Sequence, residues 1–117
     1  MKRPEQQIQR AVFQHLRQRP ARGVIAWHTP NGGARSKAEA AIMKGLGVTR
    51  GIPDVCAIKD GKFYALELKP EGGRLTDDQE NMLVALREAG AMATHAHGLD
   101  QALRVLEGWG LLRGQVT

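Results

Sequence analysis

Residues 51–69 read GIPDVCAIKDGKFYALELK, and this stretch decides the fold that we predict for the chain. Two short apolar runs flank Asp60-Gly61, a dipeptide typical of a type I′ turn. The runs are therefore predicted to pair as a β-hairpin. Such a hairpin brings Asp54, at the start of one strand, beside Glu67, near the end of the next.

The hairpin also predicts a patch of charged side chains on one face. Side chains alternate between faces along a strand, so Glu67 and Lys69 project to the same side. Two carboxylates this close repel each other unless they share a cation, and hard oxygen ligands suit Mg²⁺ or Mn²⁺. The alternative is an exposed hairpin whose acid and lysine form a surface ion pair, which contributes little.

Length and composition indicate one globular domain over residues 1–117, because 42% of the residues are hydrophobic. The sequence contains no apolar run long enough to span a membrane and no signal-peptide core after its first residues. Its single cysteine, Cys56, excludes an internal disulfide and a cysteine zinc site, and we interpret it as a small buried residue. We therefore expect a cytoplasmic protein without a membrane partner.

The charge balance favours nucleic acid as the partner. Lys and Arg number 17 against 12 Asp and Glu, which gives a net charge of +5. Such an excess suits phosphate neutralisation, although a merely basic soluble protein is the alternative. Aromatic residues make up only 4% of the chain, which argues against a platform for base stacking. We predict binding to the backbone of duplex or branched DNA.

Patterns of apolar residues predict the remaining elements. Helices are expected over residues 4–18, 37–44, 76–90 and 99–107, and strands over 24–28 and 91–96 in addition to the hairpin. This order of elements is typical of an α/β domain in which helices flank a mixed central sheet.

Two polar residues at helix starts allow two readings each. Glu5 lies three residues before Ile8 and so on the inward face of the first helix, where it either complements the helix dipole or reaches the acidic patch. Gln79 follows Thr76 at the spacing of a capping box, yet it is also near enough in sequence to serve the patch. Both roles can hold, because a capped helix start also attracts phosphate.

A glycine-rich loop and nearby basic residues are the candidate DNA contacts. Glycines let the backbone approach a phosphate closely, and histidine, asparagine and arginine can hydrogen-bond to it. The predicted contact residues are His28, Asn31, Gly32, Gly33, Arg35, Lys37 and Arg50. An ordinary turn beside a packed histidine is the alternative. His95 and His97 lack acidic neighbours in the sequence, and we interpret them as structural.

Several of these motifs together resemble a known family. Pro53-Asp54 followed by Glu67-Leu68-Lys69 resembles the PD-(D/E)XK nuclease signature. With Asn31-Gly32-Gly33 upstream and Thr76-x-x-Gln79 downstream, the chain is similar to the VRR-NUC family, the virus-type replication–repair nuclease domains. The resemblance extends over about residues 5–90, most of the chain.

The resemblance implies a restriction-endonuclease-like fold and a set of catalytic residues. These are Asp54, Glu67, Lys69 and Gln79, with Mg²⁺ or Mn²⁺ bound by Asp54, Glu67, the main-chain carbonyl of Leu68 and Glu5. It also implies a stand-alone, structure-specific DNA endonuclease of a bacterial or phage-infected cell.

The substrate that we expect is a four-way (Holliday) junction. Resolving a junction takes two symmetric cuts, and a homodimer would supply the two sites. The alternatives are a flap, nicking or end-acting nuclease, a DNA-binding module without catalysis, and a purely structural domain, which the positive charge disfavours.

Overall fold

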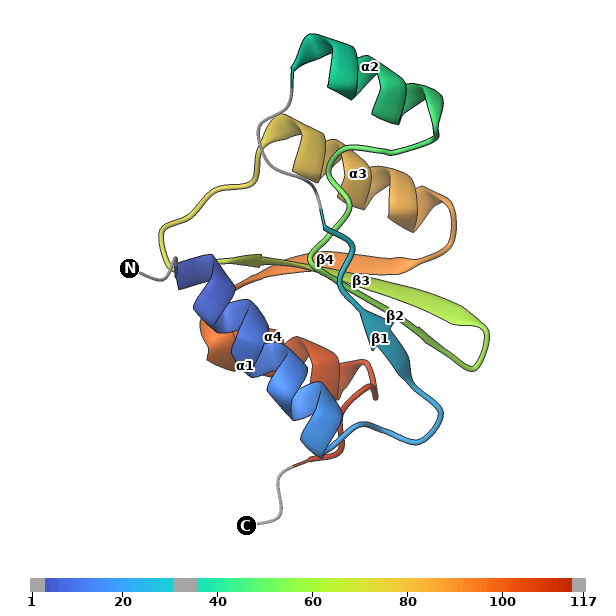
Figure 1. Cartoon of the computed structure of the whole chain (residues 1–117). Coiled ribbons are helices and arrows are strands. Elements are labelled where there is room, and N and C mark those ends of the chain that lie inside the picture. The colour runs from blue at the N-terminus through green and yellow to red at the C-terminus, as the bar shows by residue number, and fades with distance from the viewer. Residues whose placement is uncertain (1–3, 31–35, 115–117) are drawn as a thin grey trace.

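The computed structural model describes residues 4–30 and 36–114, and Figure 1 shows how their elements are arranged. The strands are β1 (Ile25–Trp27), β2 (Val55–Lys59), β3 (Lys62–Lys69) and β4 (Met92–His97), and the helices are α1 (Pro4–Gln18), α2 (Lys37–Gly45), α3 (Asp77–Glu88) and α4 (Gly98–Gly108). The strands form one sheet in the order β1-β2-β3-β4. Neighbouring strands are antiparallel except for β4, which runs parallel to β3. The prediction of an α/β fold with a mixed central sheet is confirmed.

A type I′ turn joins β2 to β3, as Asp60-Gly61 predicts. The φ angles of these two residues are +51° and +77°, and positive φ at both central positions is the mark of this turn. In the hairpin register Val55 pairs with Leu66. Asp54 precedes Val55 and Glu67 follows Leu66. The two acids therefore lie opposite each other, at the end of the hairpin that is farthest from the turn.

The two faces of the sheet carry different helices. On one face Leu66 packs with Val12 of α1 and Leu106 of α4, and all three side chains are fully buried. On the other face Ala65 and Ala93 pack with residues of α3. We call these the α1–α4 face and the α3 face. Figure 1 shows α1 and α4 below the sheet and α3 above it.

The α3 face carries the acid pair as well as a small apolar cluster. Glu67 and Lys69 follow Ala65 along β3 at intervals of two residues, so their side chains leave the sheet on this face. The apolar cluster covers the part of β3 and β4 near Leu83, which leaves the end of β3 open for polar groups. The helix α2 lies beyond α3, away from the sheet (Figure 1).

The observed boundaries differ from the predicted ones by at most two residues at each end, the largest difference being at the C-terminus of α3, which ends at Glu88 instead of residue 90. The first strand spans 25–27 instead of 24–28, the last strand 92–97 instead of 91–96, and the last helix 98–108 instead of 99–107. These limits depend on the hydrogen bonds at the ends of each element, and the periodicity of apolar residues in the sequence does not predict those hydrogen bonds. Cys56 is 2% exposed, as expected of a small buried residue. No helix in the described ranges is long and apolar enough to cross a membrane.

Gly51 controls how closely the loop before Asp54 approaches α3. Its φ is +80°, and a Cβ at this position would lie 2.8 Å from the main-chain carbonyl oxygen of Asp78. That distance is too short for a real contact, so the loop reaches the first turn of α3 only because the residue has no side chain. The approach holds the entry to β2, and with it Asp54, beside the start of α3.

We expect Gly51→Ala to destabilise the fold more than a positive φ alone explains. Gly47→Ala is the matched control, because Gly47 has φ +92° and a Cβ there would have no atom within 4 Å. The control should cost about 1–2 kcal/mol for the left-handed backbone. Gly51→Ala should cost a further 1–3 kcal/mol or so, because the helix backbone of Asp78 cannot yield easily. Urea unfolding measures both, and equal losses would show that the contact with α3 does not constrain the loop.

Candidate active site

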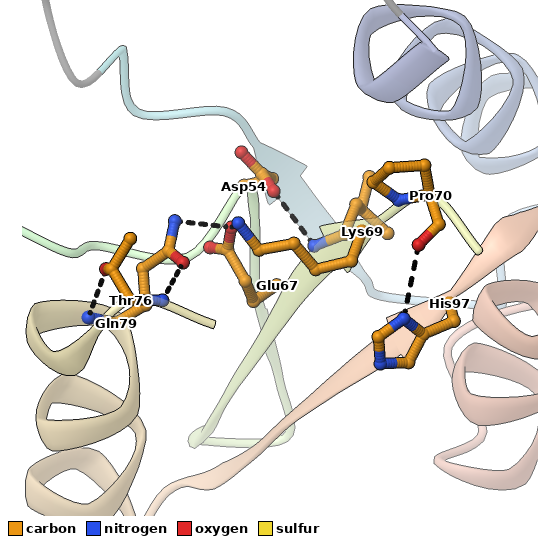
Figure 2. A network of polar contacts seen from close by, with 8 residues as sticks. Asp54, Glu67, Lys69, Pro70, Thr76, Gln79 and His97 are labelled. Carbon is orange, nitrogen blue, oxygen red and sulfur yellow. Dashed lines mark hydrogen bonds and ion pairs between the residues drawn. The ribbon is translucent and has the colours of Figure 1, made fainter. Parts of the chain in front are cut away.

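Asp54 and Glu67 stand side by side on the α3 face, as the hairpin register predicts (Figure 2). The main-chain N–H of Leu68 donates a hydrogen bond to Asp54 Oδ2 over 2.8 Å. On its other side, His28 Nδ1 donates to the main-chain carbonyl of Asp54 over 2.7 Å. Both the side chain and the backbone of Asp54 are therefore held in place.

Lys69 is buried beside Glu67. The two side chains belong to residues that are 7% and 3% exposed, and Lys69 Nζ lies 4.0 Å from Glu67 Oε2. A surface pair in full contact with water is therefore ruled out. Burying a carboxylate and an ammonium costs free energy unless other groups compensate. A buried charged pair of this kind therefore indicates a functional site.

Gln79 joins the helix cap to the acid pair. Its Oε1 accepts a hydrogen bond from the main-chain N–H of Thr76 over 2.9 Å, and Thr76 Oγ1 accepts one from the N–H of Gln79 over 3.1 Å. At the same time Gln79 Nε2 donates to Glu67 Oε2 over 3.1 Å (Figure 2). The question that the sequence left open is thus answered: Gln79 completes the capping box and contacts the acid pair with one side chain.

The surroundings of Glu67 disfavour its negative charge. Burial, the charge of Asp54 and a hydrogen bond with Asp54 together raise the pKa of Glu67 to about 8. Lys69 opposes this rise in the pKa, while the more distant charge of Glu5 adds to it. One ammonium does not offset the two crowded carboxylates, so a cation of higher charge would relieve the repulsion between them.

The oxygen ligands on this face fit Mg²⁺ or Mn²⁺. Two carboxylates, one of them buried and electrostatically strained, are hard donors of the type these ions prefer. Within the described ranges no group of three or more His, Cys, Asp and Glu side chains is placed to hold a metal. Mg²⁺ typically takes only one or two carboxylates and completes its shell with water and substrate phosphate, so two side-chain ligands suffice.

Glu5 does not take the inward position that the sequence predicts. Its side chain is exposed, and it forms no close ligand group with Asp54 and Glu67. The first turn of α1 extends past the packed part of the helix, where Val12 and Leu16 are buried. Glu5 is nevertheless near enough for its charge to act on Glu67. The correction concerns the exposure of the side chain; the role of Glu5 as a metal ligand stays a prediction.

The predicted DNA contacts fall into three groups. Asn31, Gly32, Gly33 and Arg35 lie outside the described residues. Lys37, the first residue of α2, and Arg50, in the segment that leads to β2, are both exposed. His28 is half-buried, and its Nδ1 is engaged by the backbone of Asp54, which leaves Nε2 for other contacts.

His95 and His97 lie closer to the acid pair than their sequence neighbourhood indicates. In the parallel register of β3 and β4, Glu67 pairs with His95 and Lys69 pairs with His97. Residues paired in this way project from the same face, so both imidazoles share the α3 face with the acid pair. Sequence reasoning missed this because the acidic neighbour is on another strand. The only hint in the sequence was their spacing of two residues.

Comparisons with known proteins bear on the family and the fold of the chain. The family model of the VRR-NUC domain matches residues 3–100. One solved structure, described as a VRR-NUC domain protein, has a TM-score of 0.73 at 22% identity, covering 97% of this chain and 99% of the other. A second, described as a VRR-NUC domain, has a TM-score of 0.63 at 17% identity, covering 92% and 99%.

A third similar structure is that of Hjc from Archaeoglobus fulgidus, described as a Holliday junction resolvase from an archaeal hyperthermophile. Its TM-score is 0.50 at 22% identity, over 80% of this chain and 67% of Hjc. No curated protein matches the chain. At these identities the structures establish a shared fold, and they confirm the predicted fold class.

The double role of Gln79 can be tested through stability. We expect Gln79→Ala to lower the free energy of unfolding by about 1–3 kcal/mol, because it leaves the Thr76 N–H without its acceptor and Glu67 without a donor. Thr76→Ala removes one capping hydroxyl and should cost about 1 kcal/mol. Asn81→Ala, at an exposed position of α3, is the control and should change stability by less than about 0.5 kcal/mol. Urea unfolding at pH 7 would contradict the double role if Gln79→Ala matched the control.

Proposed function

Because this chain belongs to the VRR-NUC domain family, we propose that it is a metal-dependent endonuclease that hydrolyses DNA phosphodiester bonds. The observation that carries the proposal is the buried pair of Glu67 and Lys69 beside the half-buried Asp54. A group of this kind destabilises a protein unless a ligand uses it, and two carboxylates with one ammonium suit a cation and a phosphate.

Each residue of the group has a distinct task in the proposed mechanism. Asp54 and Glu67, with the main-chain carbonyl of Leu68 as the family implies, hold the cation. The chemistry that Mg²⁺ or Mn²⁺ supplies when bound is polarisation of the scissile phosphate and acidification of a water molecule. Lys69 positions or deprotonates the attacking water and neutralises charge that develops on the phosphate oxygens. Gln79 orients Glu67 through the 3.1 Å hydrogen bond.

DNA as the substrate is supported by charge and by the placement of helix ends. The chain carries a net charge of +5, and Lys37 and Arg50 are exposed on the segment between β1 and β2. The N-terminus of α3 lies beside Glu67, because Gln79 in its first turn contacts that residue. Helix N-termini favour phosphate, although Asp77, Asp78 and Glu80 in this first turn offset part of that positive potential.

A cleavage assay tests the nuclease proposal directly. We expect the protein to cut DNA in Mg²⁺ or Mn²⁺ and to lose activity in a chelator. Asp54→Asn, Glu67→Gln and Lys69→Ala should each lower the cleavage rate by at least about 100-fold while leaving DNA binding in place. Lys62→Ala is the matched control, since Lys62 belongs to the same strand as Lys69 but is exposed at its far end.

Two results would decide against the proposal or narrow it. If the wild type leaves four-way junctions, flaps, nicked DNA and linear duplex intact in both metals, the nuclease proposal fails. DNA binding without cleavage would then favour the non-catalytic module. If cleavage occurs, the ranking of the four substrates identifies the preferred structure.

The substrate that we propose is the four-way junction, cut by a homodimer. Hjc, whose fold resembles this one, is a Holliday junction resolvase. One copy of the chain contains one acid pair, whereas resolution requires two symmetric cuts. A flap, nicking or end-acting nuclease needs only one copy, so the oligomeric state helps to separate these alternatives.

An exposed apolar surface supports the homodimer. The helix α2 contains no buried residue, although Ile42 is 63% exposed and Leu46, just after it, is 75% exposed. A nine-residue helix is marginal in water without tertiary packing. On the sheet, Ile25 and Ile58 form a register pair on the α3 face, and both are also exposed. A second copy of the chain would cover such side chains and supply the missing packing for α2.

The dimer makes a prediction for sedimentation. We expect the wild type to sediment as a dimer, and Leu46→Glu to shift it toward the monomer by placing a charge in the apolar contact. Gln14→Glu adds the same charge at an exposed position of α1, on the opposite side of the sheet, and should leave the dimer unchanged. A wild-type monomer at working concentration that still resolves junctions would contradict the homodimer.

A further inference from the structure

His95 and His97 form a pair of imidazoles beside the candidate active site. Both residues are on β4, two positions apart, and they pair in register with Glu67 and Lys69 of β3. Both are half-buried on the α3 face, and His97 contacts Pro70 in the segment between β3 and α3. Their ring centroids are 5.1 Å apart, with the ring planes at 85°.

The hydrogen bonds of the two rings leave nitrogen lone pairs unused. His97 Nδ1 lies 3.2 Å from the main-chain carbonyl oxygen of Pro70 (Figure 2). A carbonyl can only accept, so Nδ1 carries the proton, and Nε2 of the neutral ring keeps its lone pair. His95 has no hydrogen bond within residues 4–30 and 36–114, and its nearest ring partner is His97. A backbone carbonyl that holds one nitrogen of an imidazole is the usual support for a metal ligand at the other.

The separation of the rings suits one shared metal ion. A zinc–imidazole bond is about 2.0–2.1 Å long, which puts each ring centroid about 3 Å from the ion. At a tetrahedral angle, two such rings have centroids about 5 Å apart. The observed 5.1 Å matches this value, and the two rings would have to rotate from their edge-to-face arrangement to bring both nitrogens onto one ion.

An anion is a poorer fit for this pair. A neutral imidazole with its proton on Nδ1 has no donor at Nε2 for a phosphate oxygen. Glu67 is the cross-strand neighbour of His95, and Lys69 is that of His97. The free Nε2 lone pair of His97 therefore favours a metal ion over an anion.

We propose that His95 and His97 bind one divalent transition-metal ion, such as Zn²⁺, at a site separate from the oxygen ligands of Asp54 and Glu67. Imidazole suits Zn²⁺, Ni²⁺ and Cu²⁺, whereas Mg²⁺ requires oxygen, so the two sites select different ions. The protein supplies two ligands within its described ranges, and water or a phosphate oxygen fills the remaining positions. An ion here lies beside Lys69 and adds positive charge next to the acid pair.

Direct metal binding tests the site without any measurement of nuclease activity. Protein prepared without a histidine tag is titrated with Zn²⁺ by calorimetry, and with Co²⁺ to record the visible absorption of an imidazole-bound ion. We expect one bound ion per chain, and a loss of affinity of more than about tenfold in His95→Gln and in His97→Gln. His15→Gln is the matched control, because the His15 ring is engaged by Arg19 on the far side of the sheet, and it should bind the ion as the wild type does.

The carboxylate variants separate this site from the proposed nuclease site. Asp54→Asn and Glu67→Gln should keep the Zn²⁺ affinity within a few-fold, even though they remove the Mg²⁺ ligands. Zinc-induced shifts of the His95 and His97 ring signals in the NMR spectrum of the wild type give a second readout that needs no variant. The inference is overturned if the wild type binds no Zn²⁺, if neither histidine substitution weakens binding, or if the carboxylate variants abolish it.

Discussion

The antiparallel pairing of β2 with β3 is the constraint on which the rest of this structure depends. It places Asp54 opposite Glu67, and the strand periodicity then puts Lys69 on the same face. The apolar side chains between them, among which Leu66 is fully buried, hold the hairpin against α1 and α4. Hydrophobic packing on one face of β3 therefore holds the strand in place and offsets the unfavourable electrostatic interactions on its other face.

Several elements hold the two acids in place despite their mutual repulsion. The Leu68 N–H holds Asp54 from within the hairpin, and Gln79 holds Glu67 from the start of α3. The burial and the neighbouring acid that raise the pKa of Glu67 to about 8 make the group unfavourable without a cation. Proteins accept such a cost in stability mainly at functional sites, which agrees with the nuclease site that we propose.

The fold and the central acids could be predicted because they follow from local rules. The turn dipeptide Asp60-Gly61 and the alternation along β3 were enough to pair Asp54 with Glu67 and to put Lys69 beside them. The exposure of the Glu5 side chain could not be predicted, since it depends on how far α1 extends past its packed residues. The closeness of His95 to an acid was missed for a similar reason, because Glu67 lies 28 positions earlier in the chain, on a neighbouring strand.

The sequence by itself determined the hairpin, the helix caps and the charges that gather at the end of β3, because turn chemistry and side-chain alternation act over a few residues. Only the tertiary structure decided which other groups surround these charged side chains. The docking of α3 gave Gln79 its two partners, burial gave Glu67 its raised pKa, and the parallel addition of β4 set two imidazoles beside the acid pair. Those outcomes depend on contacts between segments far apart in the chain. The local periodicity of the sequence does not predict such contacts.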